Sequence, residues 1–188
     1  MKIATVTLKG ITPYSQSRAY GMDEPKLEKE THDAYEKRTW RKRLHVNERG
    51  YVFIPPMAWK NALSEAAKYN PRQIKGQGKA TYTKNIEAGV LVMTQVELPI
   101  KAEDVPGEWY FVPADGRRGS GKRVHKCFPV IREWGGVVEF HILDEKLTPE
   151  IFTSTLTDAG QFIGIGRFRP RNNGYYGRFE VGSVTWSL

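Results

Sequence analysis

The residues best suited to chemistry lie close together near the end of the chain, from Gly160 to Val181. This stretch reads GQFIGIGRFRPRNNGYYGRFEV and contains no acid before Glu180. Glycines allow tight turns and let a backbone approach a ligand closely. Arginine guanidinium groups are planar forks that fit phosphate, and aromatic rings offer faces on which bases stack. The combination predicts a loop that contacts a nucleic-acid strand through Gly164, Gly166, Gly174, Gly177, Arg167, Arg169, Arg171, Tyr175 and Tyr176. The alternative is a glycine-rich hairpin whose arginines are only solvated.

Three further segments repeat this basic character, although runs of charge are usually solvated surface. Residues 36–49 carry six lysines or arginines around Trp40, and residues 68–84 and 116–126 carry five each without any acid. Together with the glycine-rich loop, these segments hold 20 of the 29 lysines and arginines. Such segregation suits a groove that follows a phosphate backbone. The further phosphate-binding candidates are Arg41, Arg43, Lys75, Lys79, Arg117, Arg118, Lys122 and Arg123, and Trp40 is a candidate for base stacking.

Composition narrows the class of protein. A length of 188 residues predicts a single domain with insertions, and a net charge of +8 with a pI near 9.5 points to a polyanionic partner, nucleic acid before an anionic membrane surface. The single cysteine, Cys127, rules out an internal disulfide and suits a reducing compartment. The alternating, charged N-terminus is not a signal peptide, and no apolar run is long enough to cross a bilayer. We therefore expect a cytoplasmic protein without a membrane partner.

The elements that must position these residues follow from hydrophobic periodicity and from turn residues. Alternating patterns predict strands, and apolar residues at helical spacing after a proline or a threonine cap predict helices. The predicted order is strand 2–9, helix 57–69, strand 87–100, strand 136–143, helix 148–160 and strand 178–187. This βαββαβ order predicts an α+β fold with a ferredoxin-like core, the type also used by RNA-recognition domains.

Two large insertions interrupt this core, at about residues 11–50 and 101–134. The first contains a charged helical run, 26–44, followed by a short apolar strand, 51–54. In the second, the apolar stretches 109–112 and 127–131 flank the basic tip 116–126, which predicts a β-hairpin arm. Residues 68–84 read as a flexible basic loop. No RNP-type aromatic signature lies on the central strands, so binding is expected from the insertions and the glycine-rich loop.

The strand-and-helix sequence FIPPMAWKNAL at 53–63 and the late IGIGRFRPRNNGYYGRFEV resemble the RAMP superfamily of CRISPR-associated proteins. The resemblance extends over the chain in architecture, through short motifs. It implies a palm core with a thumb-like insertion and, most closely, a backbone subunit that polymerises along guide RNA in an antiviral ribonucleoprotein. Two features depart from that pattern: the chain is small for a backbone subunit, and two residues instead of one separate Gly174 from Gly177. A phage or mobile-element relative that coats single-stranded DNA or RNA outside any CRISPR complex therefore stays open.

The same superfamily includes metal-independent RNA endonucleases that use a histidine as general base. His45 and His125 lie in basic segments, where neighbouring cations would favour such chemistry. The acidic pairs Asp23-Glu24 and Asp144-Glu145 have no matching histidine or cysteine cluster, so we expect neither a metal nor another cofactor.

We therefore predict a non-enzymatic, sequence-independent single-strand binder, with RNA preferred over DNA, that forms a homo-oligomeric filament or joins a multi-subunit ribonucleoprotein. The alternatives are the histidine endoribonuclease, a phage-type single-stranded DNA-binding protein, and an inhibitor that docks its basic face on an acidic protein.

Overall fold

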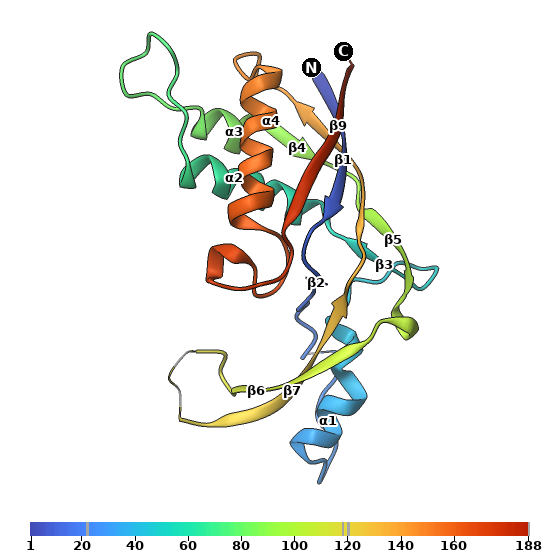
Figure 1. The fold of residues 1–188 in the computed structure, drawn as a ribbon. Helices are drawn as coiled ribbons and strands as arrows, with labels where there is room; N and C mark the ends of the chain where they lie inside the picture. The colour runs from blue at the N-terminus through green and yellow to red at the C-terminus, as the bar shows by residue number, and fades with distance from the viewer. Residues whose placement is uncertain (22, 118, 120, 188) are drawn as a thin grey trace.

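A four-stranded antiparallel sheet lies at the centre of the computed structural model, which describes residues 1–21, 23–117, 119 and 121–187 (Figure 1). Its strand order is β4 (Val90–Val92), β8 (Gly135–Ile142), β1 (Lys2–Gly10) and β9 (Phe179–Ser187). Helix α2 (Pro56–Tyr69) lies between β1 and β4 in the sequence, and α4 (Pro149–Asp158) lies between β8 and β9. The predicted α+β fold with a ferredoxin-like βαββαβ core is confirmed.

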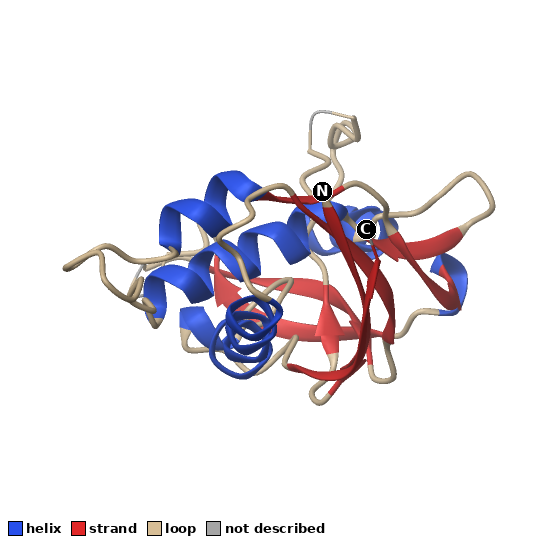
Figure 2. Cartoon of the chain, turned by 90° about the horizontal axis from the view of Figure 1, so that it is seen from above, coloured by secondary structure: helices blue, strands red, loops and turns tan. Residues whose placement is uncertain are grey.

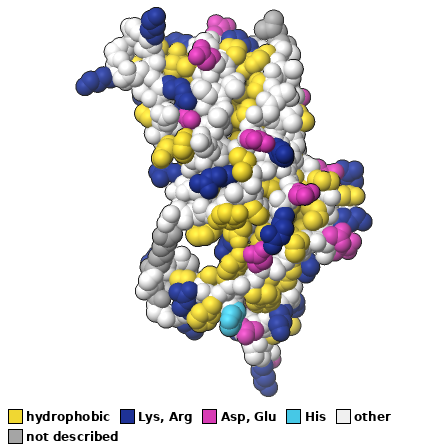
Figure 3. All heavy atoms as spheres, viewed as in Figure 1, with side chains coloured by type: hydrophobic (Ala, Val, Ile, Leu, Met, Phe, Trp, Pro, Cys, Tyr) yellow, Lys and Arg dark blue, Asp and Glu magenta, His cyan; other side chains and the backbone are white. Residues whose placement is uncertain are grey.

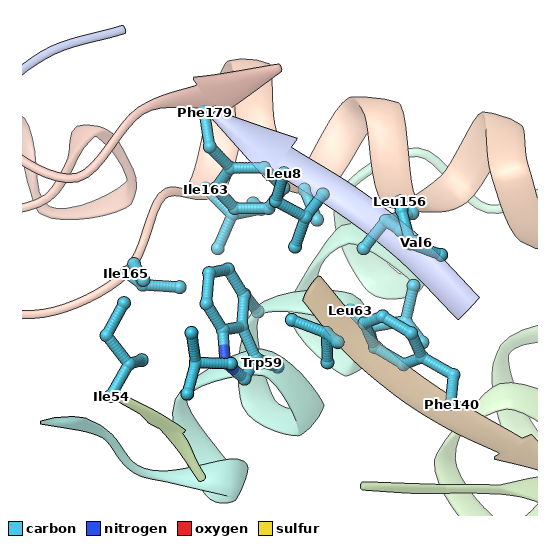
Figure 4. Close-up of a cluster of buried hydrophobic side chains, with 14 of the residues drawn as sticks. Val6, Leu8, Ile54, Trp59, Leu63, Phe140, Leu156, Ile163, Ile165 and Phe179 are labelled. Atoms are coloured by element: carbon cyan, nitrogen blue, oxygen red, sulfur yellow. The ribbon is translucent and has the colours of Figure 1, made fainter. Parts of the chain in front are cut away.

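Both helices cover the same face of this sheet, as the two views of the ribbon show (Figures 1 and 2). The alternation of β1 buries Ala4, Val6 and Leu8 beneath them. Helix α2 begins at Pro56, where a missing N–H costs nothing, and buries Trp59 and Leu63 at helical spacing. These side chains meet in one apolar cluster (Figure 4). Within the described residues, no helix covers the opposite face of the sheet (Figures 1 and 2).

The predicted strand 87–100 is wrong, because two strands and part of a helix occupy that range. Helix α3 (Thr83–Gly89) is followed by β4, and β5 (Val96–Lys101) leaves the central sheet to pair with β3 (Tyr51–Ile54). Residues 93–95 make the break. The basic loop predicted over 68–84 is confined to residues 70–82, between α2 and α3.

The two insertions pack against each other at the lower end of the molecule in Figure 1. The first contains β2 (Tyr14–Ser15), α1 (His32–Thr39) and a 3₁₀ turn, η1 (Trp40–Arg43), so its helix is shorter than the predicted run. The second contains a 3₁₀ turn, η2 (Ala102–Asp104), and the predicted β-hairpin, β6 (Gly107–Pro113) with β7 (Arg123–Ile131). Strand β2 pairs with β7, which ties the hairpin, here called the arm, to the first insertion.

The chain leaves α4 through a π-helical turn, η3 (Ala159–Ile163), and enters the glycine-rich loop, which contains a 3₁₀ turn, η4 (Pro170–Asn172), before β9. This loop lies between the lower end of α4 and the arm (Figure 1). Among the described residues, no helix combines the length and the apolar character needed to cross a membrane.

Candidate nucleic-acid interface

The beginning of the glycine-rich loop is fixed by apolar packing against the core and by backbone hydrogen bonds. Ile163 and Ile165 are buried and point toward Trp59 in the core (Figure 4). The backbone N–H of Ile165 donates to the carbonyl of Gly177 at 3.0 Å, which closes the loop on itself. The N–H of Arg167 donates to the carbonyl of Ser15 at 2.8 Å. The loop is therefore a built structure in which Arg167 has a defined position.

The glycines of the loop make this close packing possible. Gly166 has φ +80°, and a Cβ atom there would overlap the Ser15 carbonyl and the Tyr14 ring. Gly177 has φ +79°, and its Cβ would overlap the carbonyl of Ile165. A Cβ atom at Gly164 or Gly174 would also overlap atoms of this chain. The close approach that the sequence suggested for a ligand is thus made by the protein's own backbone, and all four glycines shape the loop.

Arg167 sits among aromatic rings at the junction of the loop and the arm. Its guanidinium carbon lies 3.5 Å from the centre of the Phe128 ring of β7, and 5.5 and 5.9 Å from those of Tyr110 and Tyr176. Nη1 is buried and has no hydrogen-bond partner among the described residues. Burial lowers the pKa of Arg167 from its ordinary value. An arginine stays charged even so, and the site therefore holds a cation among aromatic rings.

A cavity of about 610 Å³ opens beside this arginine, between the arm and the loop. Five rings line it (Tyr110, Phe128, Phe168, Tyr175 and Tyr176), with the cations Lys126 and Arg167 and no acid among the described lining residues. Tyr175 and Asn172 stand at its edge, where both are exposed. Figure 3 shows the molecule hollowed where the arm curls away from the body. The cavity combines apolar stacking faces with positive charge.

Two of the tyrosines that line the cavity are joined through their hydroxyls. The Tyr110 and Tyr176 hydroxyls bond to each other, and Tyr110 donates to Glu108. Burial, followed by the hydrogen bonds to Glu108 and Tyr176, raises the pKa of Tyr110 well above its usual range. Glu108 in turn is paired with Arg132 at 3.0 Å. Tyr110 therefore stays neutral, and the charge of Glu108 is already balanced by Arg132.

A second cavity, of about 350 Å³, lies beside Gly166 and Arg167 and includes His45, Gln16 and Ser17. The His45 ring packs on Phe53 with 5.6 Å between centroids. Burial, and secondly the charge of Arg18, lower the pKa of His45. His45 is therefore neutral at pH 7, in the form that can accept a proton.

Two predicted contact residues, Trp40 and Arg43, are buried, and a third, Arg41, is exposed but bonded within the protein. Trp40 and Arg43 are each 7% exposed, so neither the ring nor the guanidinium faces solvent. Arg43 forms an ion pair with Glu36 at 2.6 Å. Arg41 stacks on Trp40 at 4.1 Å and donates to the carbonyls of Ala102, Glu103 and Val105. These residues hold the first insertion to the second, and the interface that we assemble leaves them out.

Three other cations of the first insertion are also paired. Arg38 and Lys42 pair with Glu24 at 3.0 and 2.8 Å, and Arg49 pairs with Glu97 at 2.6 Å. The acids lie elsewhere in the sequence, so the positive run in the sequence is largely neutralised in the fold. The paired cations are therefore left out of the interface assembled below.

The remaining predicted cations divide into two groups. Arg169 pairs with Glu65 at 2.6 Å, and Arg123 lies over Phe111 and donates to its carbonyl. Arg118 lies outside the described residues. The second group is exposed and has no ion pair within the described part of the chain: Lys75, Lys79, Arg117, Lys122 and Arg171.

These exposed cations come from three segments that face the same side. The 70–82 loop, the glycine-rich loop and the tip of the arm all open on the left of Figure 1. In Figure 3, lysine and arginine side chains occur along this edge above and below the hollow. Arg171 lies 5.9 Å from the ring of Tyr69, at the end of α2, and so stands between the cavity and the 70–82 loop. We call this side the basic edge.

The sequence did not single out several residues of the site: Tyr110, Phe128, Lys126, Phe168 and Asn172. Alternation along β6 was the available signal, since Tyr110 and Val112 face the cavity while Trp109 and Phe111 are exposed on the other face. Phe168 adopts φ +49°, which few residues other than glycine do. Its position depends on the turn of the loop, which periodicity does not reveal.

Among the described residues, no group of three histidine, cysteine, aspartate or glutamate side chains is arranged to hold a metal ion. No family model and no curated protein sequence matches this chain. Among solved structures, the fold is similar to the crystal structure of Cmr6 from Pyrococcus furiosus, with 15% sequence identity and a TM-score of 0.49 over 96% of this chain and 98% of that chain. A likeness at this level assigns no function, and the site itself must supply one.

Proposed function

We propose that this protein binds single-stranded nucleic acid along the basic edge, without sequence specificity, and takes RNA in preference to DNA. The observation that carries the proposal is the cavity between the arm and the glycine-rich loop, where aromatic faces surround a cation. Bases stack on such faces whatever their identity, and cations beside them bind the phosphates.

The charge distribution supports a strand that runs along the edge. The 70–82 loop, which carries Lys75 and Lys79, lies at one end of the edge, the glycine-rich loop with Arg171 lies in the middle, and the arm with Arg117 and Lys122 lies at the other end (Figure 1). Because these side chains are exposed and free of ion pairs within the described residues, a phosphate would gain their charge without breaking an existing contact. Sequence-independent binding follows, because phosphate contacts carry no direct sequence information.

The preference for RNA and the assembly state rest on the resemblance of the IGIGRFRPRNNGYYG stretch to the RAMP glycine-rich loop. We propose that several copies coat one strand, as a filament or within a CRISPR-type ribonucleoprotein. Copies bound side by side would leave the exposed ring faces of Trp109 and Phe111, on the outer side of the arm, next to a neighbour.

The test is a salt series of binding to a labelled 40-nucleotide unstructured strand, as RNA and as DNA. Each phosphate contact adds about 0.7 to the slope of log affinity against log salt for a single strand. The double variant Lys75→Gln/Lys79→Gln should therefore lower the slope by about 1.4. Lys26→Gln/Lys37→Gln removes the same charge from the first insertion and should leave the slope unchanged. Equal effects of the two pairs would contradict the proposed edge, and no binding at low salt would contradict the function.

A second candidate function has one specific observation in its favour, the neutral His45 in a cavity shared with Arg167. A neutral imidazole accepts a 2′-hydroxyl proton, and an adjacent guanidinium stabilises the charge that develops on the phosphate. This is the metal-independent endoribonuclease alternative. Incubation of labelled RNA with wild type and His45→Gln in EDTA separates the two functions. Cleavage that His45→Gln abolishes supports the nuclease, and intact RNA at full binding supports the binder.

A further inference from the structure

We propose that two copies of this chain pair along the free edge of the arm, strand β6 against strand β6, in an antiparallel dimer with two-fold symmetry. Tyr110 lies at the symmetry axis, and Trp109 of each copy lies opposite Phe111 of the other. The dimer forms without nucleic acid, so this inference goes beyond the proposed function. A contact of this symmetry closes on itself, and copies would meet a strand as dimers.

Strand β6 is an edge of its sheet, because the order is β2-β7-β6 and no described strand pairs with its outer side (Figure 1). Just before β6, the N–H of Val130 donates to the carbonyl of Pro106 at 3.0 Å, which makes these two residues a hydrogen-bonded pair. Bonded and non-bonded pairs alternate along an antiparallel ladder, and the register of β6 with β7 is unbroken. The N–H and C=O groups of Trp109 and Phe111 therefore point away from β7.

These outward groups are open to a further strand. Within the described residues, no hydrogen bond reaches the carbonyl of Trp109 or the two outward N–H groups. The carbonyl of Phe111 accepts from the guanidinium of Arg123, and its second lone pair is still available. A row of unpaired backbone groups on an edge strand is a template for strand addition.

The side chains of this edge match a second copy of the same strand. Trp109 and Phe111 lie on one face of β6 and are 45% and 53% exposed. In the pairing centred on Tyr110, each Trp109 ring faces a Phe111 ring, and directly opposite aromatic pairs stabilise antiparallel strands. A pairing centred on Trp109 would put Phe111 opposite Gly107, which has no side chain to contact.

The charges on either side of β6 are complementary in the same register. Glu103 and Asp104 precede the strand, whereas Arg117 and Lys122 follow it at the tip of the arm. All four are exposed, and none has an ion pair within the described chain. Antiparallel pairing brings the acidic base of each arm alongside the basic tip of the other. Complementary charges at the rim of an interface select this orientation, and they favour a second copy as the occupant.

The size of the contact predicts a weak dimer. A fully buried aromatic side chain covers about 150–250 Å², so the four half-exposed rings of a dimer would bury about 300–500 Å² together. Pairing of the two backbones adds to this area. The total lies at the low end for specific complexes, so the dimer should depend on concentration.

Sedimentation equilibrium of nuclease-treated protein over about 1–200 μM tests the dimer. Phe111→Lys places a charge in the paired edge and should leave a monomer. Leu91→Lys is the matched control, because Leu91 is 42% exposed on β4, an edge strand of the central sheet. It should leave the dimer unchanged. A monomeric wild type would overturn the proposal, and so would a dimer that Leu91→Lys abolishes and Phe111→Lys does not.

A comparison of Phe111→Pro with Phe111→Ala isolates the backbone hydrogen bonds. Both variants lose the ring, but only proline removes the outward N–H, and an edge strand tolerates proline at such a position. The dimer contains two of these donors, so Phe111→Pro should dimerise about five- to 150-fold more weakly than Phe111→Ala. Equal dissociation constants would mean that the rings associate without strand pairing, which overturns the proposal. Thermal unfolding identifies a variant that fails to fold.

Disulfide formation gives the register independently of these variants. A non-hydrogen-bonded pair places two Cα atoms about 4.5 Å apart, within the range of a disulfide, so oxidised Tyr110→Cys should form a covalent dimer. Trp109→Cys lies opposite Phe111 and should not. A covalent dimer of Trp109→Cys alone would overturn the register. The salt series with RNA is read separately: a monomer that binds RNA keeps the proposed function and loses this inference, and a dimer that binds no RNA does the reverse.

Discussion

The ion pair between Glu36 and Arg43 should be the main electrostatic support of the arm. Both side chains are buried, with 2% and 9% of their surface exposed, and Nη1 of Arg43 lies 2.6 Å from Oε1 of Glu36. The same Glu36 oxygen accepts the backbone N–H of Cys127 in β7 at 2.7 Å, and Arg43 donates to the Cys127 carbonyl at 2.9 Å. One ion pair thus satisfies both backbone groups of a strand residue.

Removing one partner leaves the other charge buried and unpaired, which costs about 3–5 kcal/mol. For a chain of this length each kcal/mol lowers the unfolding midpoint by about 2–4 °C, so Arg43→Met should lower it by about 6–20 °C. Glu36→Gln keeps an acceptor for the Cys127 N–H but removes the charge, and it should fall in the same range. The double variant removes both charges together, so its loss should be at least about 2 kcal/mol smaller than the sum of the single losses.

Urea and thermal unfolding of the three variants measure these free energies, and hydrogen exchange of the β7 amides shows whether the arm loosens first. Glu24→Gln is the control, because its ion pairs with Arg38 and Lys42 belong to the same insertion but are exposed to solvent. It should change the midpoint little. Additive losses in the double variant, or an equal loss in Glu24→Gln, would refute the reasoning.

Two further predictions concern the glycine-rich loop and its neighbour. Gly166→Ala places a Cβ against the Ser15 carbonyl at a positive φ, and backbone strain alone should lower the free energy of unfolding by about 1–3 kcal/mol, as measured in urea. Gly21→Ala is the control, because a Cβ there meets nothing within 4 Å, and it should be neutral. An equal loss in the two variants would refute the packing role of Gly166. The fold lowers the pKa of His45, so as the pH falls the unfolded chain takes up a proton on this imidazole before the folded chain does. The contribution of His45 to the free energy of unfolding is therefore complete above the ordinary pKa of 6.5 and is lost as the pH falls below it. His45→Gln should flatten that decline in unfolding midpoints between pH 7.5 and 5.5, and an unchanged slope would contradict it.

Sequence periodicity was sufficient for the core because each core element buries one face. The spacing of Trp59 and Leu63 and the alternation of Ala4, Val6 and Leu8 reflect contact with the same interior. It failed at 87–100, where Val90 and Val96 are both buried but belong to different sheets. Alternation is the same in either sheet, so it cannot reveal that a chain changes partners.

Charge and composition gave only part of the candidate site. Arg43 and Arg167 look alike in the sequence, since each is one of several arginines near an aromatic residue. Glu36 neutralises the first, whereas Nη1 of the second has no partner in the described chain. The difference depends on which side chain the fold turns toward each guanidinium, and residue types alone do not contain that information, although Glu36 lies only seven residues from Arg43. The glycines illustrate the same limit, because the atoms that would meet a Cβ at Gly166 lie in β2.

Photo-crosslinking of bound RNA, followed by mass spectrometry of the linked peptides, tests the central claim most directly. A uridine-rich strand irradiated on the protein links to the rings that stack on its bases. We predict links at Tyr175 and Phe168 in the glycine-rich loop and at Tyr110 in the arm, on either side of the cavity. Links confined to Trp109 and Phe111, or to His141 on the sheet face without helices, would contradict the proposed interface.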